Sequence, residues 1–285
     1  MAQEQTRRWS MGALSDVQQR AVDSMRRDGI AVVAFRDLFD DDARWQNLYA
    51  DIHDFARETE KRLTELLQRE DGKAYLARRF YHPKTKDKKP PPWKFAADDR
   101  WLQLGLSSEI LDVVNGYRGE PTYLIDLDNW YTIPNPDARE RVRSQQWHRD
   151  PWDNHIVKVF IYFSDVGEQA GPFEYIRGSA AGGPYGDLWP WVPKGIYPPQ
   201  DEFEATVSPE DRLTLTGPAG TVIFSDTSGF HCGGSAKTTP RILSYHTYVS
   251  AASKKPARYR VDLPADGNGL SESARFALSR SLKRS

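Results

Sequence analysis

Six short strand-like runs in the second half of the chain constrain its fold more than any other feature. β-branched and aromatic residues dominate these runs, and connections that contain glycine or proline separate them. Many short strands divided by turns are typical of two packed sheets or a closed barrel. The sequence therefore predicts a mainly β fold whose strands lie within 123–133, 145–150, 157–166, 172–179, 221–226 and 242–249.

The first third of the chain has helical patterns instead. Ser15 suits a helix N-cap and Gly29 a C-terminal cap, and apolar residues recur at helical spacing over much of the following sequence. A short apolar run between these helices suits a buried strand. These patterns predict a strand over 30–35 and helices over 15–28, 43–70, 107–117 and 271–282.

The chain is expected to fold as one domain. A length of 285 residues, 39% of them hydrophobic and 28% charged, is ordinary for a single globular unit. We expect residues 1–120 to be a mostly helical part that packs on a barrel, 121–250 to form the β core, and 251–285 to form a C-terminal tail or helix.

Two connections have unusual compositions. The segment 83–94 contains four prolines and five lysines, which predicts a loop or an ordered flap. Its lysines either bind an anionic substrate or are simply solvated, and a charge run usually is solvated. The long connection 181–209 is rich in aromatic residues and is interpreted as a lid, with a packing arm or an oligomer contact as alternatives.

Charge and cysteine content exclude several partners and compartments. The formal net charge is -1, so no general attraction to nucleic acid or to an anionic membrane is expected. Cys232 is the single cysteine, and the first residues lack the apolar stretch of a secretory signal, which together favour a cytoplasmic protein. No apolar run approaches the roughly 18 residues needed to span a bilayer.

The tripeptide His148-Arg149-Asp150 is the strongest chemical signal. On an extended strand, residues two apart point to the same face, so one imidazole and one carboxylate would reach the same point. His231, on a distant strand, is the best third ligand. Two histidines and one carboxylate form the facial triad that holds non-haem Fe(II) with open coordination positions. By the same alternation Gln146 shares the face of His148, where its amide either contacts a ligand or is satisfied by backbone.

Arg241 lies ten residues after His231, at the start of an apolar strand. A guanidinium inside a barrel needs an anionic partner, because burying an unpaired charge is costly. Its planar fork fits a carboxylate with two parallel hydrogen bonds. A dicarboxylate co-substrate between the metal and Arg241 would satisfy both ends.

The chain resembles the phytanoyl-CoA dioxygenase-like branch of the Fe(II)/2-oxoglutarate oxygenases. The blocks that carry the resemblance appear in the family's order: 14–16 through 27–33, Trp147 to Asp150, 160–166 with 171–173 and 177–179, and His231 to Arg241. The resemblance implies a double-stranded β-helix, the cupin-like jelly roll, flanked by helices.

The resemblance also implies roles for individual residues. His148, Asp150 and His231 match the iron ligands, and Arg241 matches the residue that pairs with the distal carboxylate of 2-oxoglutarate. The family uses the strand before the metal motif for co-substrate contacts. Asn129 and Tyr131 lie on that strand and are therefore candidates to bind the co-substrate too.

The predicted function is an oxygenase that uses Fe(II), 2-oxoglutarate and O2 and hydroxylates an unactivated C–H bond of a small metabolite, with release of succinate and CO2. Desaturation, cyclisation and epimerisation stay open as outcomes, as does the oligomeric state. The aromatic connection and the lysine-rich segment point to an anionic or ring-bearing substrate. The alternatives are a jelly-roll metalloenzyme that does not use 2-oxoglutarate and a non-catalytic metal-containing jelly roll that binds a metabolite or carbohydrate.

Overall fold

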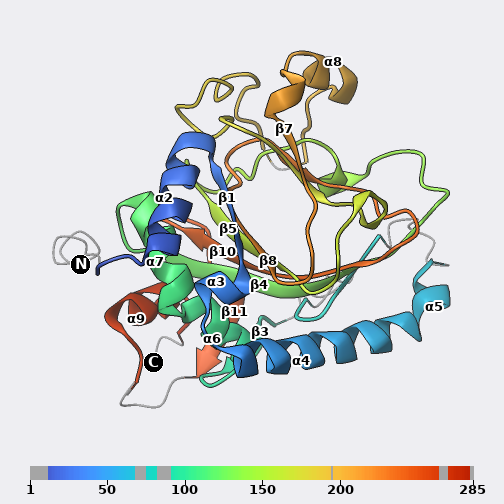
Figure 1. Ribbon diagram of the computed structural model, residues 1–285. Helices are drawn as coiled ribbons and strands as arrows, with labels where there is room; N and C mark the ends of the chain where they lie inside the picture. The colour runs from blue at the N-terminus through green and yellow to red at the C-terminus, as the bar shows by residue number, and fades with distance from the viewer. Residues whose placement is uncertain (1–11, 68–74, 82–90, 194, 263–268, 283–285) are drawn as a thin grey trace.

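The larger of two main sheets has six antiparallel strands, seen in Figure 1. The computed structural model describes residues 12–67, 75–81, 91–193, 195–262 and 269–282. Within these residues the strand order is β1-β8-β5-β10-β4-β2. The bounds are Ile30–Ala34 for β1, Thr221–Asp226 for β8, Val157–Tyr162 for β5, Arg241–Val249 for β10, Tyr123–Thr132 for β4 and Leu76–Arg78 for β2.

The second main sheet has three strands in the order β7-β6-β9, with bounds Arg212–Leu215, Phe173–Ile176 and His231–Gly233. From β5 to β10 the chain crosses repeatedly between the sheets, because β5, β8 and β10 lie in the larger sheet and β6, β7 and β9 in the smaller one. The Phe160 ring of β5 packs at a tilt against the Phe173 ring of β6, with ring centroids 4.7 Å apart, so the sheets pack face to face. This pattern is that of a jelly roll, which confirms the predicted mainly β fold with flanking helices.

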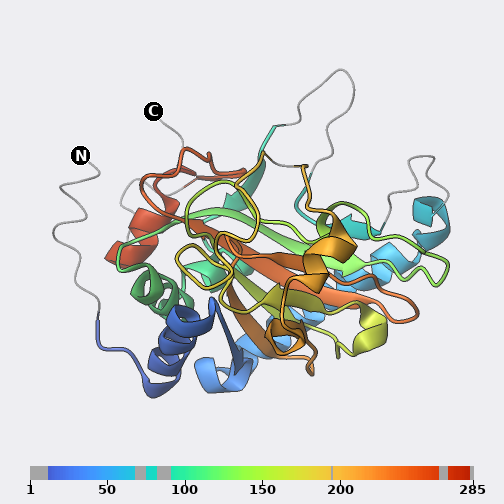
Figure 2. The same ribbon diagram turned by 90° about the horizontal axis from the view of Figure 1, so that it is seen from above.

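Helices cover the outer face of the larger sheet. In Figure 1, α4 runs below this sheet and α8 lies at the opposite side of the molecule, and Figure 2 gives the view from above. The helices are α2 Asp16–Asp28, α3 Phe35–Leu38, α4 Asp42–Glu60, α5 Leu63–Leu67, α6 Arg100–Leu106, α7 Ser108–Arg118, α8 Gln200–Ala205 and α9 Glu272–Leu278. A further pair of parallel strands joins β3 Trp93–Ala96 to β11 Tyr259–Asp262.

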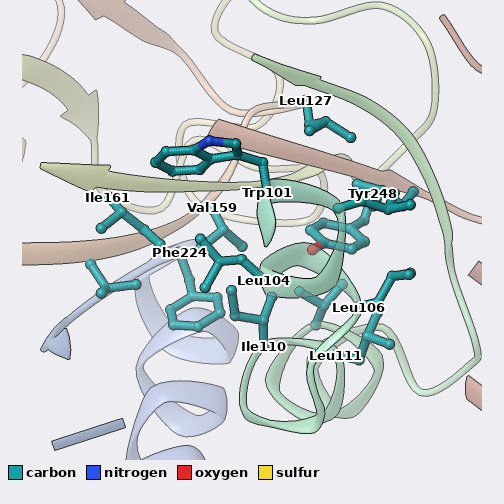
Figure 3. Packing of buried hydrophobic residues seen from close by; sticks show 14 of the residues in the cluster. Trp101, Leu104, Leu106, Ile110, Leu111, Leu127, Val159, Ile161, Phe224 and Tyr248 are labelled. Atoms are coloured by element: carbon teal, nitrogen blue, oxygen red, sulfur yellow. The ribbon is translucent and has the colours of Figure 1, made fainter. Parts of the chain in front are cut away.

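The main hydrophobic core lies between this sheet and the helices, as Figure 3 shows. Leu104 of α6 and Ile110 of α7 lie against Ile161 of β5 and Phe224 of β8, and all four side chains are buried. At about 25 cal/mol per Å² of apolar surface removed from water, a large buried side chain contributes roughly 1.5–3 kcal/mol. This core holds the larger sheet in place and so provides a rigid support for the residues on its other face, toward the smaller sheet.

Cap residues set the helix boundaries as predicted. Ser15 caps α2 in a capping box, because its hydroxyl accepts from the Gln18 N–H while the Gln18 side chain accepts from the Ser15 N–H. Gly29 ends the helix with a φ of 78°, a left-handed conformation that glycine adopts without a steric cost. The helix expected over 43–70 is divided instead, since α4 ends at Glu60 and α5 follows, and 68–70 lie outside the described residues.

Two expected elements need correction. The strand predicted over 145–150 is not regular, because residues Arg143–Gln145 form a 3-10 turn and only His148 makes a strand-like bridge. Of the loop predicted over 83–94, residues 83–90 lie outside the described part, and Trp93 and Lys94 belong to β3. Within the described residues, no helix is long and apolar enough to cross a membrane.

Candidate metal centre

His148, Asp150 and His231 meet at one point between the two sheets. His148 and His231 form an isolated antiparallel bridge, in which the backbone N–H of each donates to the carbonyl oxygen of the other at 3.0 Å. Asp150 is held by its own N–H, which donates to the Thr227 carbonyl at 2.9 Å. One ligand atom from each of the three side chains lies within 4.8 Å of the other two.

The two imidazoles are oriented by hydrogen bonds from their Nδ1 atoms. His148 Nδ1 lies 2.8 Å from the Gln146 carbonyl oxygen, and His231 Nδ1 lies 3.0 Å from that of Gly229. A carbonyl oxygen only accepts, so in this arrangement Nδ1 carries the proton and Nε2 carries the lone pair. Backbone partners of this kind fix the tautomer and ring orientation of metal-binding histidines.

The surroundings keep the ligands in the charge states that bind a metal. Burial raises the pKa of Asp150, but Lys158 and the two imidazoles outweigh it and hold that pKa well below its usual range. Lys158 Nζ lies 2.5 Å from Asp150 Oδ2. Burial, and then repulsion from His148, lowers the pKa of His231 well below its ordinary value. A carboxylate and a neutral His231 imidazole result, and together with the His148 imidazole they form a donor set that fits non-haem Fe(II).

Arg241 lies on the wall of a small cavity, of about 50 Å³, that also borders His148 and His231. Its guanidinium is buried, and its Nε has no hydrogen-bond partner among the described residues. One N–H donates to the Gly171 carbonyl, but no carboxylate in the described part of the chain forms an ion pair with it. Burial lowers its pKa, and the nearby Tyr162, Cys232 and Glu174 only partly oppose this. The arrangement leaves Arg241 able to bind an anion that reaches the metal centre.

The other predicted co-substrate residues are placed differently. Antiparallel pairing sets Arg241 opposite Thr132 and Ile242 opposite Tyr131, so Tyr131 lies on the helix-facing side of β4. Its hydroxyl donates to Glu60 of α4 at 3.2 Å. Asn129 shares that side, opposite Ser244. Asn129 and Tyr131 therefore lie on the face of β4 away from Arg241, and neither lines the cavity at the metal centre.

Gln146 does not line this cavity either. The 3-10 turn breaks the strand alternation from which its position was predicted, and the neighbouring Gln145 borders the cavity instead. Gln146 contributes to the metal centre through its backbone carbonyl, which orients His148.

The sequence analysis missed several residues that line the cavity. Trp130 and Thr132 of β4 border it, as does Lys158 of β5. The register of β4 against β10 was needed to find the first two. The sequence did contain a feature that could have identified Lys158, because it is the single charged residue in the otherwise apolar strand Val157–Tyr162.

The connection 181–209 is anchored to the metal motif by the residues that flank His148. Arg149 donates to the carbonyl oxygens of Ser179 and Tyr185, at 3.3 and 3.2 Å, and its guanidinium lies 4.0 Å from the Phe230 ring centroid. The Trp147 N–H and indole N–H donate to Gln200 and Glu204, both at 2.6 Å. These contacts hold the connection over the metal centre.

Comparison with known proteins shows a shared fold. No protein-family model matches this sequence, and no curated protein matches it. EctD from S. alaskensis with 2-oxoglutarate and 5-hydroxyectoine is 15% identical over 96% of this chain and 88% of that chain, with a TM-score of 0.52. EctD with bound Fe is 16% identical over 86% of this chain and 82% of that one, with a TM-score of 0.53. AviO1 from Streptomyces viridochromogenes Tue57 is 19% identical over 86% of this chain and 100% of that one, with a TM-score of 0.50. The chain therefore has the jelly-roll fold of solved structures that hold iron or 2-oxoglutarate.

Proposed function

We propose that the chain is an Fe(II)- and 2-oxoglutarate-dependent oxygenase of one domain that hydroxylates a C–H bond of a small metabolite in the cytoplasm. The observation that carries the proposal is the buried Arg241, which has no carboxylate partner in the described residues and shares a cavity with His148 and His231. A metalloprotein that needed only its metal would have no reason to bury this cation, because an unpaired buried charge destabilises the fold.

Each residue has a role in this proposal. His148, Asp150 and His231 would hold the iron, and Arg241 would pair with the distal carboxylate of 2-oxoglutarate. Trp147 and Arg149 keep the connection 181–209 over the centre, which excludes water from the reaction. When bound, Fe(II) with 2-oxoglutarate and O2 supplies oxidation of a C–H bond with release of succinate and CO2. The structures of EctD with Fe and with 2-oxoglutarate support the proposal, since the same fold holds both.

The first test is anaerobic addition of Fe(II) and then 2-oxoglutarate to metal-free protein, monitored by the weak visible charge-transfer band of the chelate. We expect the band in wild type, none in His148→Ala, and a band that needs ~10–100-fold more 2-oxoglutarate in Arg241→Ala, because a charge-assisted pair contributes about 1.5–3 kcal/mol.

Matched controls are His53→Ala and Arg20→Ala. His53 bonds the Phe163 carbonyl outside the cavity, and Arg20 is an exposed residue of α2. Both should give the wild-type band. Confirmed iron binding without any band would reject 2-oxoglutarate as co-substrate and favour a metalloenzyme that does not use it.

A further inference from the structure

A second cavity, much larger than the first, lies at the edge of the larger sheet. Its volume is about 620 Å³, against about 50 Å³ for the cavity at the metal centre. It lies where β2 ends at Arg78, beside residues Asp126 to Asp128 of β4. Small-molecule sites usually occupy ~300–1,000 Å³. The cavity at the metal centre therefore has no room for a primary substrate beside the co-substrate proposed there, whereas this second cavity, here called the edge cavity, has the usual size.

Aromatic rings form one wall of the edge cavity. The ring of Phe80 lies 5.4 Å from that of Trp93 and 5.0 Å from that of Phe95, and Phe95 meets Tyr259 edge to face at 5.6 Å. Tyr81 lines the same space and is 41% exposed. Aromatic walls bind planar ring systems by stacking and by edge-to-face contacts.

Charged side chains form the opposite wall. Arg78 pairs with Asp128 at 2.7 Å, and Arg258 pairs with Asp126 at 2.8 Å. The Tyr245 hydroxyl joins the two pairs, since it accepts from Arg78 at 2.8 Å and donates to Asp126 at 3.0 Å. Lys255 and Arg260 also line the cavity, so its described lining carries four cationic side chains and two carboxylates. The excess of positive charge favours an anion.

The edge cavity adjoins the metal centre through Trp152, two residues after Asp150. Lys158 Nζ, which contacts Asp150, lies 5.4 Å from the Trp152 ring centroid. On the cavity side, Lys255 Nζ lies 4.4 Å and Arg258 Cζ 5.5 Å from the same centroid. The Trp152 ring thus lies between the Lys158 ammonium, which contacts Asp150, and the cationic wall of the edge cavity.

The rings of Trp130 and Tyr245 provide a second connection between the edge cavity and the cavity at the metal centre. Trp130 borders the cavity at the metal centre and lies 4.5 Å from the Tyr245 ring. The guanidinium of Arg78, on the wall of the edge cavity, lies 5.4 Å from the Trp130 ring. Contacts among Arg78, Tyr245 and Trp130 thus connect the edge cavity to the cavity at the metal centre.

We propose that the edge cavity binds the primary substrate, and that this substrate is a ring-bearing organic anion. Its ring packs on the wall of Phe80, Trp93 and Phe95, its anionic group meets the cationic wall, and its reacting carbon points past Trp152 toward the metal. The reaction of this substrate at the metal rests on the proposed function, whereas its binding in the edge cavity does not.

The binding test uses 6-fluoro-2-naphthoate and its neutral analogue 6-fluoro-2-naphthalenemethanol, observed by fluorine NMR with saturating 2-oxoglutarate. The two probes share the ring and differ in the anionic group. We expect one naphthoate per chain, bound at least ~10-fold more tightly than the alcohol, as a charge-assisted contact predicts. Equal affinity for the two probes would overturn the assignment of an anionic substrate.

Variants locate the probe. Arg260→Gln should weaken naphthoate binding several-fold and leave the alcohol unchanged, whereas Trp93→Leu should weaken both. The matched controls are Arg20→Gln and Tyr49→Leu, which lie on α2 and α4 away from the cavity. Arg241→Ala should also leave naphthoate binding unchanged. Binding that disappears in Arg241→Ala would place the probe in the 2-oxoglutarate position and overturn the inference.

Broadening of the fluorine signal by a paramagnetic metal tests whether the bound probe lies close to the metal centre. With Mn(II) in place of Fe(II), the fluorine signal of bound naphthoate should broaden strongly in wild type and not in His148→Ala. Binding without broadening in wild type would overturn the substrate assignment. A chelate band in the Fe(II) experiment without naphthoate binding would overturn this inference alone, whereas broadening without a chelate band would overturn the proposed function and leave the cavity as a ligand site beside a metal.

Discussion

The two faces of β10 are equally buried but treat their polar groups differently. On the face toward α6, His246 Nε2 lies 2.9 Å from the Trp101 carbonyl oxygen and the Tyr248 hydroxyl donates to the Gly105 carbonyl at 2.6 Å. On the face toward the smaller sheet, Arg241 is left with a guanidinium Nε that has no partner in the described residues. Ser244 Oγ and His246 Nδ1 on the helix-facing side also have no partner in the described residues, but these groups are neutral, whereas Arg241 carries a charge that can bind an anionic ligand.

Two phenylalanines on the paired strands β5 and β8 provide the strongest test of this contrast. Phe224 faces the helices and Phe160 borders the cavity at the metal centre. Phe224→Ala should lower the free energy of unfolding by ~3–5 kcal/mol, because it leaves a void in a close-packed core. Phe160→Ala should cost at least ~1 kcal/mol less, since its neighbours already border open space. Urea unfolding of both variants measures the difference, and equal losses would contradict the contrast.

His246 should make the helix-facing side sensitive to acid. Burial lowers its pKa to about 4, and the bond to the Trp101 carbonyl only partly opposes this. In the unfolded chain a histidine takes up its proton near pH ~6.5, so the unfolded state binds more protons between the two values and stability falls as pH falls through this window. The loss should reach roughly 3 kcal/mol near pH 4.

His246→Gln should reduce that acid loss while its amide keeps a donor for the Trp101 carbonyl. The measurement is urea unfolding at several pH values from 7 to 4. Tyr248→Phe is the control on the same face, since it removes one hydrogen bond and should lower stability by about 1 kcal/mol at every pH. A slope as steep in His246→Gln as in wild type would assign the acid sensitivity to other groups.

The smallest expected change in stability is at Arg241. Arg241→Met should leave the free energy of unfolding unchanged or raise it by up to ~1 kcal/mol, because a buried unpaired cation is replaced by an apolar side chain. Wild type, but not the variant, should gain thermal stability from millimolar 2-oxoglutarate with Mn(II). A loss of several kcal/mol in Arg241→Met would show that Arg241 holds the fold together and would remove the contrast between the faces.

Local signals predicted most of the elements and the three side chains that the structure brings together as a candidate metal site. Ser15 and Gly29 set the ends of α2 through contacts within a few residues. The spacing of His148 and Asp150 placed both side chains at one point even though 145–150 is not a strand, because the single bridge at His148 keeps that stretch extended.

Features that depend on distant contacts could not be predicted in this way. The face to which Asn129 and Tyr131 point depends on the register of β4 against β10, more than 100 residues later in the chain. The choice between Gln145 and Gln146 depends on a three-residue turn without a distinctive sequence. The edge cavity combines β2, β3, β4 and the segment 255–260, and no single motif spans them.

Strand pairing around the centre has a consequence for amide hydrogen exchange. β10 is hydrogen-bonded to β4 on one edge and to β5 on the other over residues 243–248, so the backbone of these residues should exchange only on global opening. The ligand His148 is held by a single bridge and His231 by a three-residue strand, so their amides should exchange through local opening. A bound metal would join these two segments and slow their exchange, which makes the metal a cross-link for the least protected part of the barrel.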